Sequence, residues 1–320
     1  MALDDRLADS LRLPLIAAPM FLVSGPDLVI AACLSGVIGS FPTANARTAE
    51  TLDAWMTTIG EATSRAAADG AKVAPWAPNV VVHSTNVRLN REIEVIERHA
   101  APIVITALGG PRAIIDRVHA WGGQVFADVN SVRFAKKAVD AGADGLILGA
   151  AGAGGHTGAM NGLAFLAAVR EFFDGPVALG GGISNGAEIR AVEVAGADLA
   201  VMGTAFIATR ESLAQNEYKQ MLIDSTIDDL VCTNTVTSVL ANWLRPTLVR
   251  AGIDPTDFLV NPKVDFGDEK SREEKLKRWR DIWSAGHGVG GVAAIEPVAA
   301  LVERLRVQYR AAAARPARFG

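Results

Sequence analysis

A single histidine, His156, stands in a glycine-rich stretch that reads LILGAAGAGGHTGAMNG. Imidazole titrates near neutral pH, so a histidine in this setting could act as a general base. Gly154 and Gly155 precede it directly, and residues this small would leave room for a flat cofactor and a substrate. Local sequence leaves a second reading open, in which a solvent-exposed histidine sits in a loop that the glycines make flexible.

Two further glycine-rich turns could bind an anion. In VALGGGISNGAEIR, the run Gly180, Gly181 and Gly182 joins an apolar segment to a helix that Asn185 could cap. In DLAVMGTAFIATRES, the pair Gly203-Thr204 stands at a similar junction. Glycine lets backbone N–H groups approach an anion at a helix N-terminus. Tight turns alone would also use glycine, but three in a row exceed that need, and we predict phosphate binding.

These residues require elements that bring them together. Eight short apolar segments alternate with longer segments of helical period: 14–18, 36–41, 79–82, 103–106, 124–129, 145–149, 177–179 and 199–202. The repeat of AVDAGADGLILG in AVEVAGADLAVMG predicts helices that end at Gly142 and Gly196 and lead into buried strands. Eight parallel strands predict a closed (β/α)8 TIM barrel, whose sites lie at the carboxyl ends of the strands. An open doubly wound sheet stays an alternative.

The alternation stops after residue 210. We expect a barrel of residues 1–210 plus 291–320, with a helical substrate or lid domain of residues 211–290 inserted after strand eight. Within that domain we expect a charged helix over 270–283, and a closing helix follows over 292–313. The acidic run with Asp265, Asp268, Glu269 and Lys270 is typical of a solvated surface, and we assign it no metal.

Composition excludes several classes of protein. The chain has 320 residues, half of them hydrophobic, and a formal net charge of −4, which does not fit a nucleic-acid binder. Its two cysteines, Cys33 and Cys232, predict neither a disulfide framework nor a zinc site. The acidic N-terminus and short apolar runs predict no targeting peptide and no membrane partner. We expect a cytoplasmic enzyme, and the sequence allows a homodimer without requiring one.

Several motifs together resemble the nitronate monooxygenase family, formerly called 2-nitropropane dioxygenases. They are AGAGGHTG, PVALGGGISNGAEIR, VMGTAFIATRES, LPLIAAPM, APNVVVHSTN, DVNSVRFAKKAVDAGAD, VTSVLANWLRP and WSAGHGVGGV. No single motif is specific, but the set extends over most of the chain. The resemblance implies an FMN-dependent barrel that oxidises alkyl nitronates or nitroalkanes with O2 to a carbonyl compound and nitrite.

The resemblance also implies roles for residues at matching positions. His156 would be the catalytic base. FMN would contact a set of residues from six segments of the chain: Ala18, Pro19, Met20, Asn79, Asp128, Gly154, Gly155, Gly180, Gly181, Gly182, Gly203 and Thr204. Of these, Gly180 to Gly182, Gly203 and Thr204 would hold the phosphate.

Some positions depart from the family pattern. Relatives often carry a basic or amide residue at Asp128, and Gln or Asp at Gly149. Ser238 and Leu240 replace a usual Gly and Pro, and His287 replaces a usual Gln. These departures put the substrate, more than the cofactor, in doubt.

Other candidates have weaker support. His83 could face the substrate, although a hydrogen bond within its own strand–helix loop is the reading we favour. Trp243 could line the substrate pocket or belong to the core of the lid, and His287 is a third substrate candidate. His99 and His119 are expected at the surface, at helix ends.

Two rival functions remain. One is an NAD(P)H-dependent flavin reductase acting on a quinone or an enoyl thioester on the same scaffold. The other is a phosphate-ligand-binding barrel without redox chemistry, because a fold alone does not determine a reaction.

Overall fold

The computed structural model describes residues 3–260 and 279–317. Eight parallel strands close into a barrel in the order β1-β2-β3-β4-β5-β6-β8-β9. Their bounds are β1 Leu15–Ala17, β2 Ile38–Pro42, β3 Trp76–Val81, β4 Ile103–Ala107, β5 Gln124–Val129, β6 Gly145–Gly149, β8 Val177–Gly180 and β9 Leu199–Met202. Each overlaps one of the eight apolar segments of the sequence, so the predicted TIM barrel is confirmed and the open sheet is excluded.

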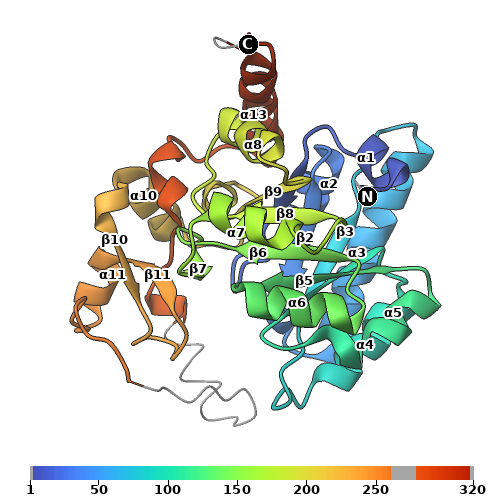
Figure 1. Ribbon diagram of the computed structural model, residues 1–320, viewed down its shortest axis with the longest axis horizontal. Coiled ribbons are helices and arrows are strands. Elements are labelled where there is room, and N and C mark those ends of the chain that lie inside the picture. The colour runs from blue at the N-terminus through green and yellow to red at the C-terminus, as the bar shows by residue number, and fades with distance from the viewer. Residues whose placement is uncertain (1–2, 261–278, 318–320) are drawn as a thin grey trace.

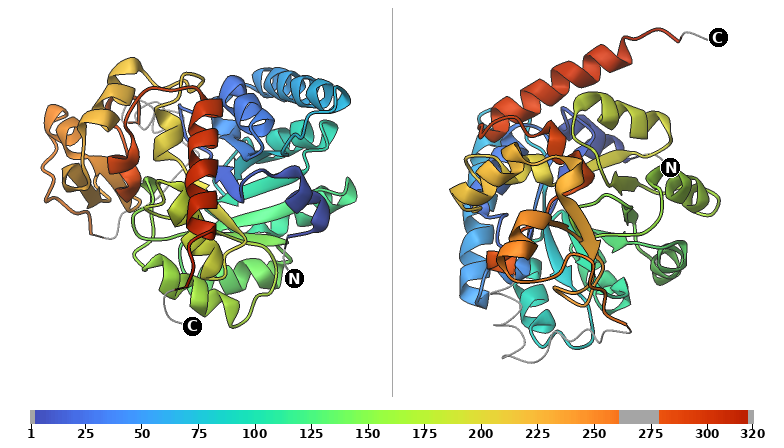
Figure 2. Two further views of the ribbon diagram at one scale, coloured as in Figure 1. Left: turned by 90° about the horizontal axis from the view of Figure 1, so that it is seen from above. Right: turned by 90° about the vertical axis from the view of Figure 1, so that its left-hand side faces the viewer.

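Helices surround the strands on the outside of the barrel (Figure 2). The outer helices are α2 Pro26–Leu34, α3 Ala49–Ala68, α4 Leu89–Arg98, α5 Ile115–Ala120, α6 Val132–Ala141, α7 Gly162–Arg170, α8 Gly186–Val194 and α13 Val298–Ala313. Shorter pieces precede or interrupt them, namely α1 Asp5–Ser10, α9 Thr204–Ile207, η1 Thr43–Asn45 and η2 Pro111–Ala113. None of the helices in the described part of the chain is long and apolar enough to cross a membrane.

Local sequence explains where two of these helices end. The Ser131 hydroxyl accepts from the Phe134 N–H at the start of α6, and Gly142 closes that helix with a φ of +98°. Gly196 follows α8 with a φ of +107°. Both angles lie in the left-handed region that favours glycine, so the predicted helix ends at Gly142 and Gly196 are confirmed.

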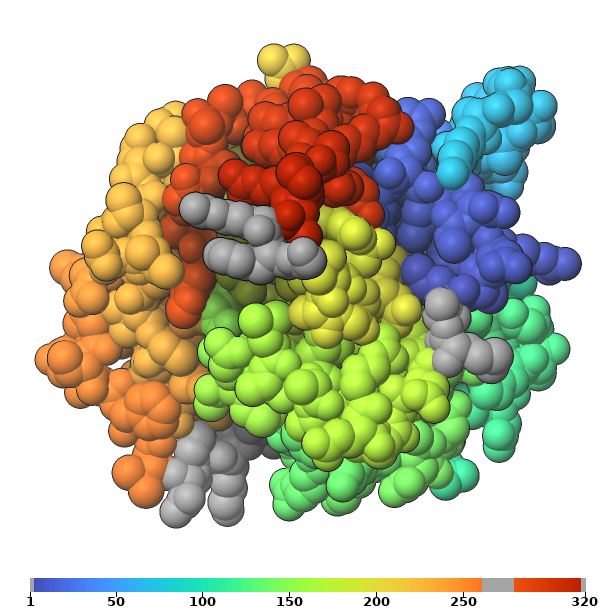
Figure 3. Space-filling model, turned by 45° about the horizontal axis from the view of Figure 1, so that its top comes forward, coloured from blue at the N-terminus to red at the C-terminus, as the bar shows by residue number. Residues whose placement is uncertain are grey.

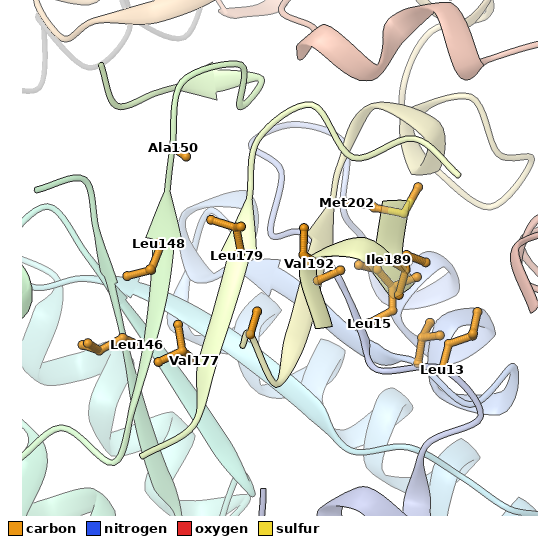
Figure 4. Packing of buried hydrophobic residues seen from close by; sticks show 14 of the residues in the cluster. Leu13, Leu15, Leu146, Leu148, Ala150, Val177, Leu179, Ile189, Val192 and Met202 are labelled. Atoms are coloured by element: carbon orange, nitrogen blue, oxygen red, sulfur yellow. The ribbon is translucent and has the colours of Figure 1, made fainter. Parts of the chain in front are cut away.

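Two apolar layers form the core. Inside the barrel, alternate strand residues such as Ile105, Phe126 and Ile147 pack together. The intervening residues face outward, and Leu146 and Leu148 of β6 lie beside Val177 and Leu179 of the neighbouring strand β8 (Figure 4). Side chains alternate between the two faces of a strand, so the residue two positions after each interior residue also points inward. These next positions lie at the barrel mouth.

The insertion is not purely helical, which corrects the prediction for residues 211–290. It contains α10 Asn216–Asp224, η3 Ile227–Asp229, α11 Arg245–Arg250 and η4 His287–Gly291, but also β10 Leu230–Thr233 and β11 Ala241–Leu244. These strands form an antiparallel sheet with β7 Gly155–His156, beside the barrel (Figure 1). Four-residue strands are too short to show an alternating pattern. Most of the predicted charged helix over 270–283 and the whole acidic run lie outside the described residues.

Helix α13, Val298–Ala313, lies in the outer ring between α8 and α2 and covers most of the closing helix predicted for 292–313. It packs along α8, and the two surfaces adjoin in the space-filling view (Figure 3). The backbones approach closely, because a Cβ on Gly186 would lie 2.0 Å from the Leu305 carbonyl oxygen. The Gln308 side chain accepts from the Gly186 N–H at 3.0 Å. The C-terminal helix therefore supports the start of α8, next to the glycine run after β8.

Candidate active site

The glycine run after β8 forms a candidate anion cradle. Gly181 and Gly182 have φ values of +141° and +74°, which L side chains rarely adopt. A Cβ on Gly181 would lie 2.8 Å from the Ala151 carbonyl oxygen, so the space is closed to side chains as well. Asn185 caps α8 by accepting from the Glu188 N–H at 3.0 Å. The run therefore leads into a capped helix N-terminus, whose dipole favours negative charge.

The second loop lies beside the first, because β8 and β9 are neighbours in the barrel. A Cβ on Gly203 would lie 3.4 Å from the Met20 sulfur and 3.5 Å from the Ala18 Cβ. The structure thus brings the ends of β1 and β9 together, with Pro19 in the same turn. The Thr204 hydroxyl accepts from the Gly286 N–H at 2.9 Å, which leaves its own proton for another acceptor.

Two predicted site residues, and one position that departs from the family pattern, line the inside of the barrel mouth. Asp128, Gly149 and Asn79 each lie two residues beyond an interior core residue on β5, β6 and β3, so they share the inward face. The nearest Asp128 carboxylate oxygen is 3.5 Å from where a Cβ on Gly149 would stand. Asn79 is almost buried and donates to the Ile105 carbonyl at 3.3 Å.

Asp128 is accessible to water, yet protein surrounds it on most sides at the bottom of the mouth. Burial raises the pKa of its carboxyl to about 6. No side chain at Gly149 fills the space beside it. A carboxyl group that titrates near neutral pH therefore faces the centre of the mouth.

His156 lies on β7, outside the barrel strands. Its backbone pairs with Ala241 of β11. The imidazole is half-buried, but its Nε2 is fully buried and has no hydrogen-bond partner. Burial lowers the pKa of His156 to about 4, because charge is costly where water is excluded. At neutral pH the side chain is therefore an uncharged imidazole.

A group of aromatic rings meets this histidine through Trp279. The Trp279 ring meets His156 edge-on, with centroids 5.6 Å apart, and lies 4.6 Å from the ring of the fully buried Trp243. Phe21, from the loop after β1, completes the group at 6.2 Å from Trp279. We call Phe21, Trp243 and Trp279 the aromatic wall. Sequence reasoning named only Trp243 of the three, since nothing local indicates that residues 21 and 279 meet.

Two asparagines that sequence reasoning missed hold the loops of the site. Asn45 donates to the carbonyls of Met20 and Ser24 and accepts from the Leu22 N–H, so it pins the turn that carries Phe21. Asn242, on β11, donates to the Ala153 carbonyl at 2.7 Å and so anchors the glycine loop before His156. The only available signal for Asn242 was its place within the motif ANWL.

The segment around His287 packs against the same loop. The His287 N–H donates to the Gly152 carbonyl at 2.9 Å, and a Cβ on Gly152 would lie 2.8 Å from the His287 Nδ1. A Cβ on Gly154 would lie 2.8 Å from the Gly286 nitrogen, and one on Gly182 would lie 3.5 Å from the His287 Cβ. His287 is therefore beside both the loop of His156 and the anion cradle.

The remaining histidines have local partners. The Nδ1 of His83 is 2.8 Å from the Thr85 hydroxyl, within the strand–helix loop as the favoured reading expected. His99 and His119 pair with the surface carboxylates of Asp53 and Asp144 at 2.9 Å. The structure therefore gathers most of the predicted site residues at one end of the barrel and leaves His99 and His119 outside it.

Comparisons with known proteins agree with this geometry. The nitronate monooxygenase family profile matches residues 6–307. A nitroalkane oxidase from Streptomyces ansochromogenes superposes with a TM-score of 0.80 at 25% identity, over 96% of this chain and 99% of that chain. FabK from Thermotoga maritima also has a TM-score of 0.80, at 23% identity and 96% coverage of both chains, and supports the fold.

Two curated relatives differ in their described activity. The nitronate monooxygenase of Paraburkholderia phytofirmans is 25% identical, over 93% of this chain and 92% of the relative. A (3aS,4S,5R,7aS)-5-hydroxy-7a-methyl-1-oxo-octahydro-1H-indene-4-carboxyl-CoA dehydrogenase of Rhodococcus jostii is also 25% identical, over 74% of this chain. The match spans 64% of that dehydrogenase's length. Together with the family match over nearly its whole length, these findings identify the chain as an oxidoreductase enzyme of the nitronate monooxygenase family.

Proposed function

We propose that the protein is an FMN-dependent nitronate monooxygenase that converts alkyl nitronates or nitroalkanes, with O2, to a carbonyl compound and nitrite. The observation that carries the proposal is His156, an uncharged imidazole with an unpartnered, buried Nε2 beside the aromatic wall. Because the imidazole is uncharged at neutral pH, it can accept a proton from a carbon acid without first releasing a proton to solvent.

The residues at the barrel mouth fit FMN. Gly180 to Gly182 and Gly203-Thr204 would hold its phosphate, since they combine closely approaching backbone, a helix N-terminus and a free hydroxyl proton. Ala18, Pro19, Met20 and Asn79 would line the ring system. When bound, FMN supplies the redox chemistry, while the protein supplies binding, orientation and electrostatics.

His156 would serve neutral nitroalkanes and preformed nitronates differently. With a nitroalkane, its Nε2 takes the proton from the carbon next to the nitro group, and the electron pair stays on the nitro oxygens. The resulting negative charge next to the imidazolium raises the pKa of His156, which favours the proton transfer. With a nitronate no base is needed, and a protonated His156 would hold the anion. The aromatic wall excludes water from this step.

A thioester-acting oxidoreductase is the second candidate. The observation that favours it is the similarity to the Rhodococcus jostii CoA dehydrogenase, together with a titratable carboxyl at Asp128 in the mouth. A quinone or enoyl-thioester reductase that uses NAD(P)H belongs to the same alternative. A non-redox phosphate-binding barrel is the weakest candidate, because it gives His156 no task.

Anaerobic spectra of the purified protein test these functions. We expect an alkyl nitronate to bleach the visible flavin band quickly. Fast bleaching by NADH without bleaching by nitronate would instead favour the reductase. A protein that stays colourless after FMN is added would favour the non-redox barrel.

The variant His156→Asn tests the base. It should retain FMN but lose about 10²–10⁴ in turnover of neutral nitroalkane, the usual size of general-base assistance. His83→Asn, at a histidine with a partner in its own loop, is the matched control and should retain turnover. Unchanged kinetics in His156→Asn would contradict the role.

A further inference from the structure

Three buried side-chain atoms among the described residues have no hydrogen-bond partner: Thr106 Oγ1, His156 Nε2 and Trp243 Nε1. Buried polar atoms without a partner are rare, because each costs about 1–3 kcal/mol. Two of these three belong to one site. The other indoles with a recorded bond behave normally, since Trp121 donates to the Ala101 carbonyl and Trp283 to the Arg280 carbonyl. The unpartnered Trp243 N–H therefore calls for an explanation.

The sheet places Trp243 and His156 on one face. Ala241 pairs with His156 in the antiparallel register, and Trp243 comes two residues later on the same strand. Residues two apart share a face, and diagonal neighbours across a strand pair are about 7–8 Å apart. Both rings contact Trp279, which agrees with this placement. The two unpartnered nitrogens therefore belong to side chains on the same face of the sheet, and both side chains lie against Trp279.

The two nitrogens have complementary chemistry. An indole N–H can only donate, whereas the Nε2 of an uncharged histidine accepts when the proton is on Nδ1. One donor and one proton acceptor match a carbon acid whose neighbouring oxygen gains charge as the proton leaves. A nitroalkane has both features, and a nitronate, which has already lost the carbon proton, has the charged oxygen. That oxygen is the group that the indole would meet.

We propose that Trp243 is a substrate-binding residue whose indole N–H donates to a nitro or nitronate oxygen, opposite His156. This rests on the proposed function for the identity of the substrate. The proton moves from carbon to the His156 Nε2, the electron pair moves onto the nitro oxygens, and the indole stabilises that charge. This step needs no oxidant. Trp243 lies on the insertion, away from the barrel strands, so it is not part of the cofactor cradle.

The test uses the FMN-loaded protein and propionate, a redox-inert carboxylate with the shape and charge of a nitronate. Binding is followed by the change in the visible flavin spectrum. Trp243→Phe keeps the aromatic ring but lacks the N–H, and it should weaken propionate binding about tenfold to a hundredfold, as for a lost bond to a charged group. Trp121→Phe removes an indole N–H far from this site and should bind propionate as the wild type does.

A second measurement covers the case in which Trp243→Phe does not fold. In the wild type with ¹⁵N-labelled tryptophan, propionate should move one indole N–H resonance downfield, and Trp243→His, which retains a ring N–H, should keep most of the affinity. Equal affinity in Trp243→Phe and wild type would overturn the proposal, and so would an indole spectrum that propionate leaves unchanged. If Trp243 binds propionate but nitronate is not oxidised, the proposed function fails while this inference stands.

Discussion

His156 pairs directly with Ala241 across the antiparallel sheet formed by β7 and β11. The candidate base is therefore paired with a strand of the insertion, although it lies on the loop that follows barrel strand β6. The cradle residues, in contrast, belong to the barrel strands and their loops. This division predicts that changes in the insertion affect turnover more than cofactor binding.

Asn242→Ala tests that division. It removes a buried hydrogen bond to Ala153 and leaves the carbonyl unpaired, so unfolding should become easier by about 1–3 kcal/mol. Turnover should fall further than FMN affinity, because the loop before His156 loses its anchor. Asn234→Ala is the control, since Asn234 bonds to Leu259 elsewhere in the insertion. Urea titrations and steady-state rates would check both, and equal turnover in the two variants would contradict the prediction.

The pH dependence of stability should reveal His156. Its pKa is about 4 in the folded chain, below the ordinary value of 6.5. Between pH 6.5 and 4 the unfolded chain binds a proton that the folded chain does not, so the free energy of unfolding falls by up to about 3 kcal/mol as pH falls. Above pH 6.5 this contribution is constant.

Asp128 works in the opposite direction, because its raised pKa lets the folded chain bind a proton first as pH falls below about 6. The measurement is therefore best made without FMN in Asp128→Asn, compared with Asp128→Asn/His156→Gln. The single variant should lose more stability between pH 6.5 and 4 than the double variant. Parallel curves would show that His156 titrates normally.

Gly181→Ala should lose FMN affinity. The added methyl group would lie 2.8 Å from the Ala151 carbonyl and would force the cradle open. Gly196→Ala is a matched control, since Gly196 also has a positive φ but has open space around it. It should cost about 1 kcal/mol of stability and retain FMN. Flavin content after dialysis and thermal melts would separate the two effects, and comparable flavin loss in both variants would count against the cradle.

The turn that carries Phe21 should be sensitive to Asn45. Leu22 has a φ of +63°, which a leucine rarely adopts, and three hydrogen bonds from Asn45 maintain it. Asn45→Ala should lower turnover and lower stability by about 2–3 kcal/mol. Leu22→Gly, which removes the backbone strain, should restore part of that stability in the double variant. If the double variant is no more stable than Asn45→Ala, the turn is not strained.

Sequence alone predicted the barrel, which the structure confirms, and it proposed the two cradle loops and His156 as the candidate base. The eight strands show themselves locally, as apolar runs between helical segments, and the closed order β1 to β9 follows from their number. The loops after strands six, seven and eight then fall at one end of the barrel. These features depend on short-range patterns, which a chain displays without its partners.

Tertiary structure decided what surrounds the base. His156 and Ala241 are far apart in the chain, as are Phe21 and Trp279, and their contacts depend on long-range pairing that no local pattern encodes. The short strands β7, β10 and β11 are stable only through one another and so carry no signal of their own. The lowered pKa of His156 is likewise a property of its burial, because desolvation exists only after the chain has folded and Trp279 has packed against the imidazole.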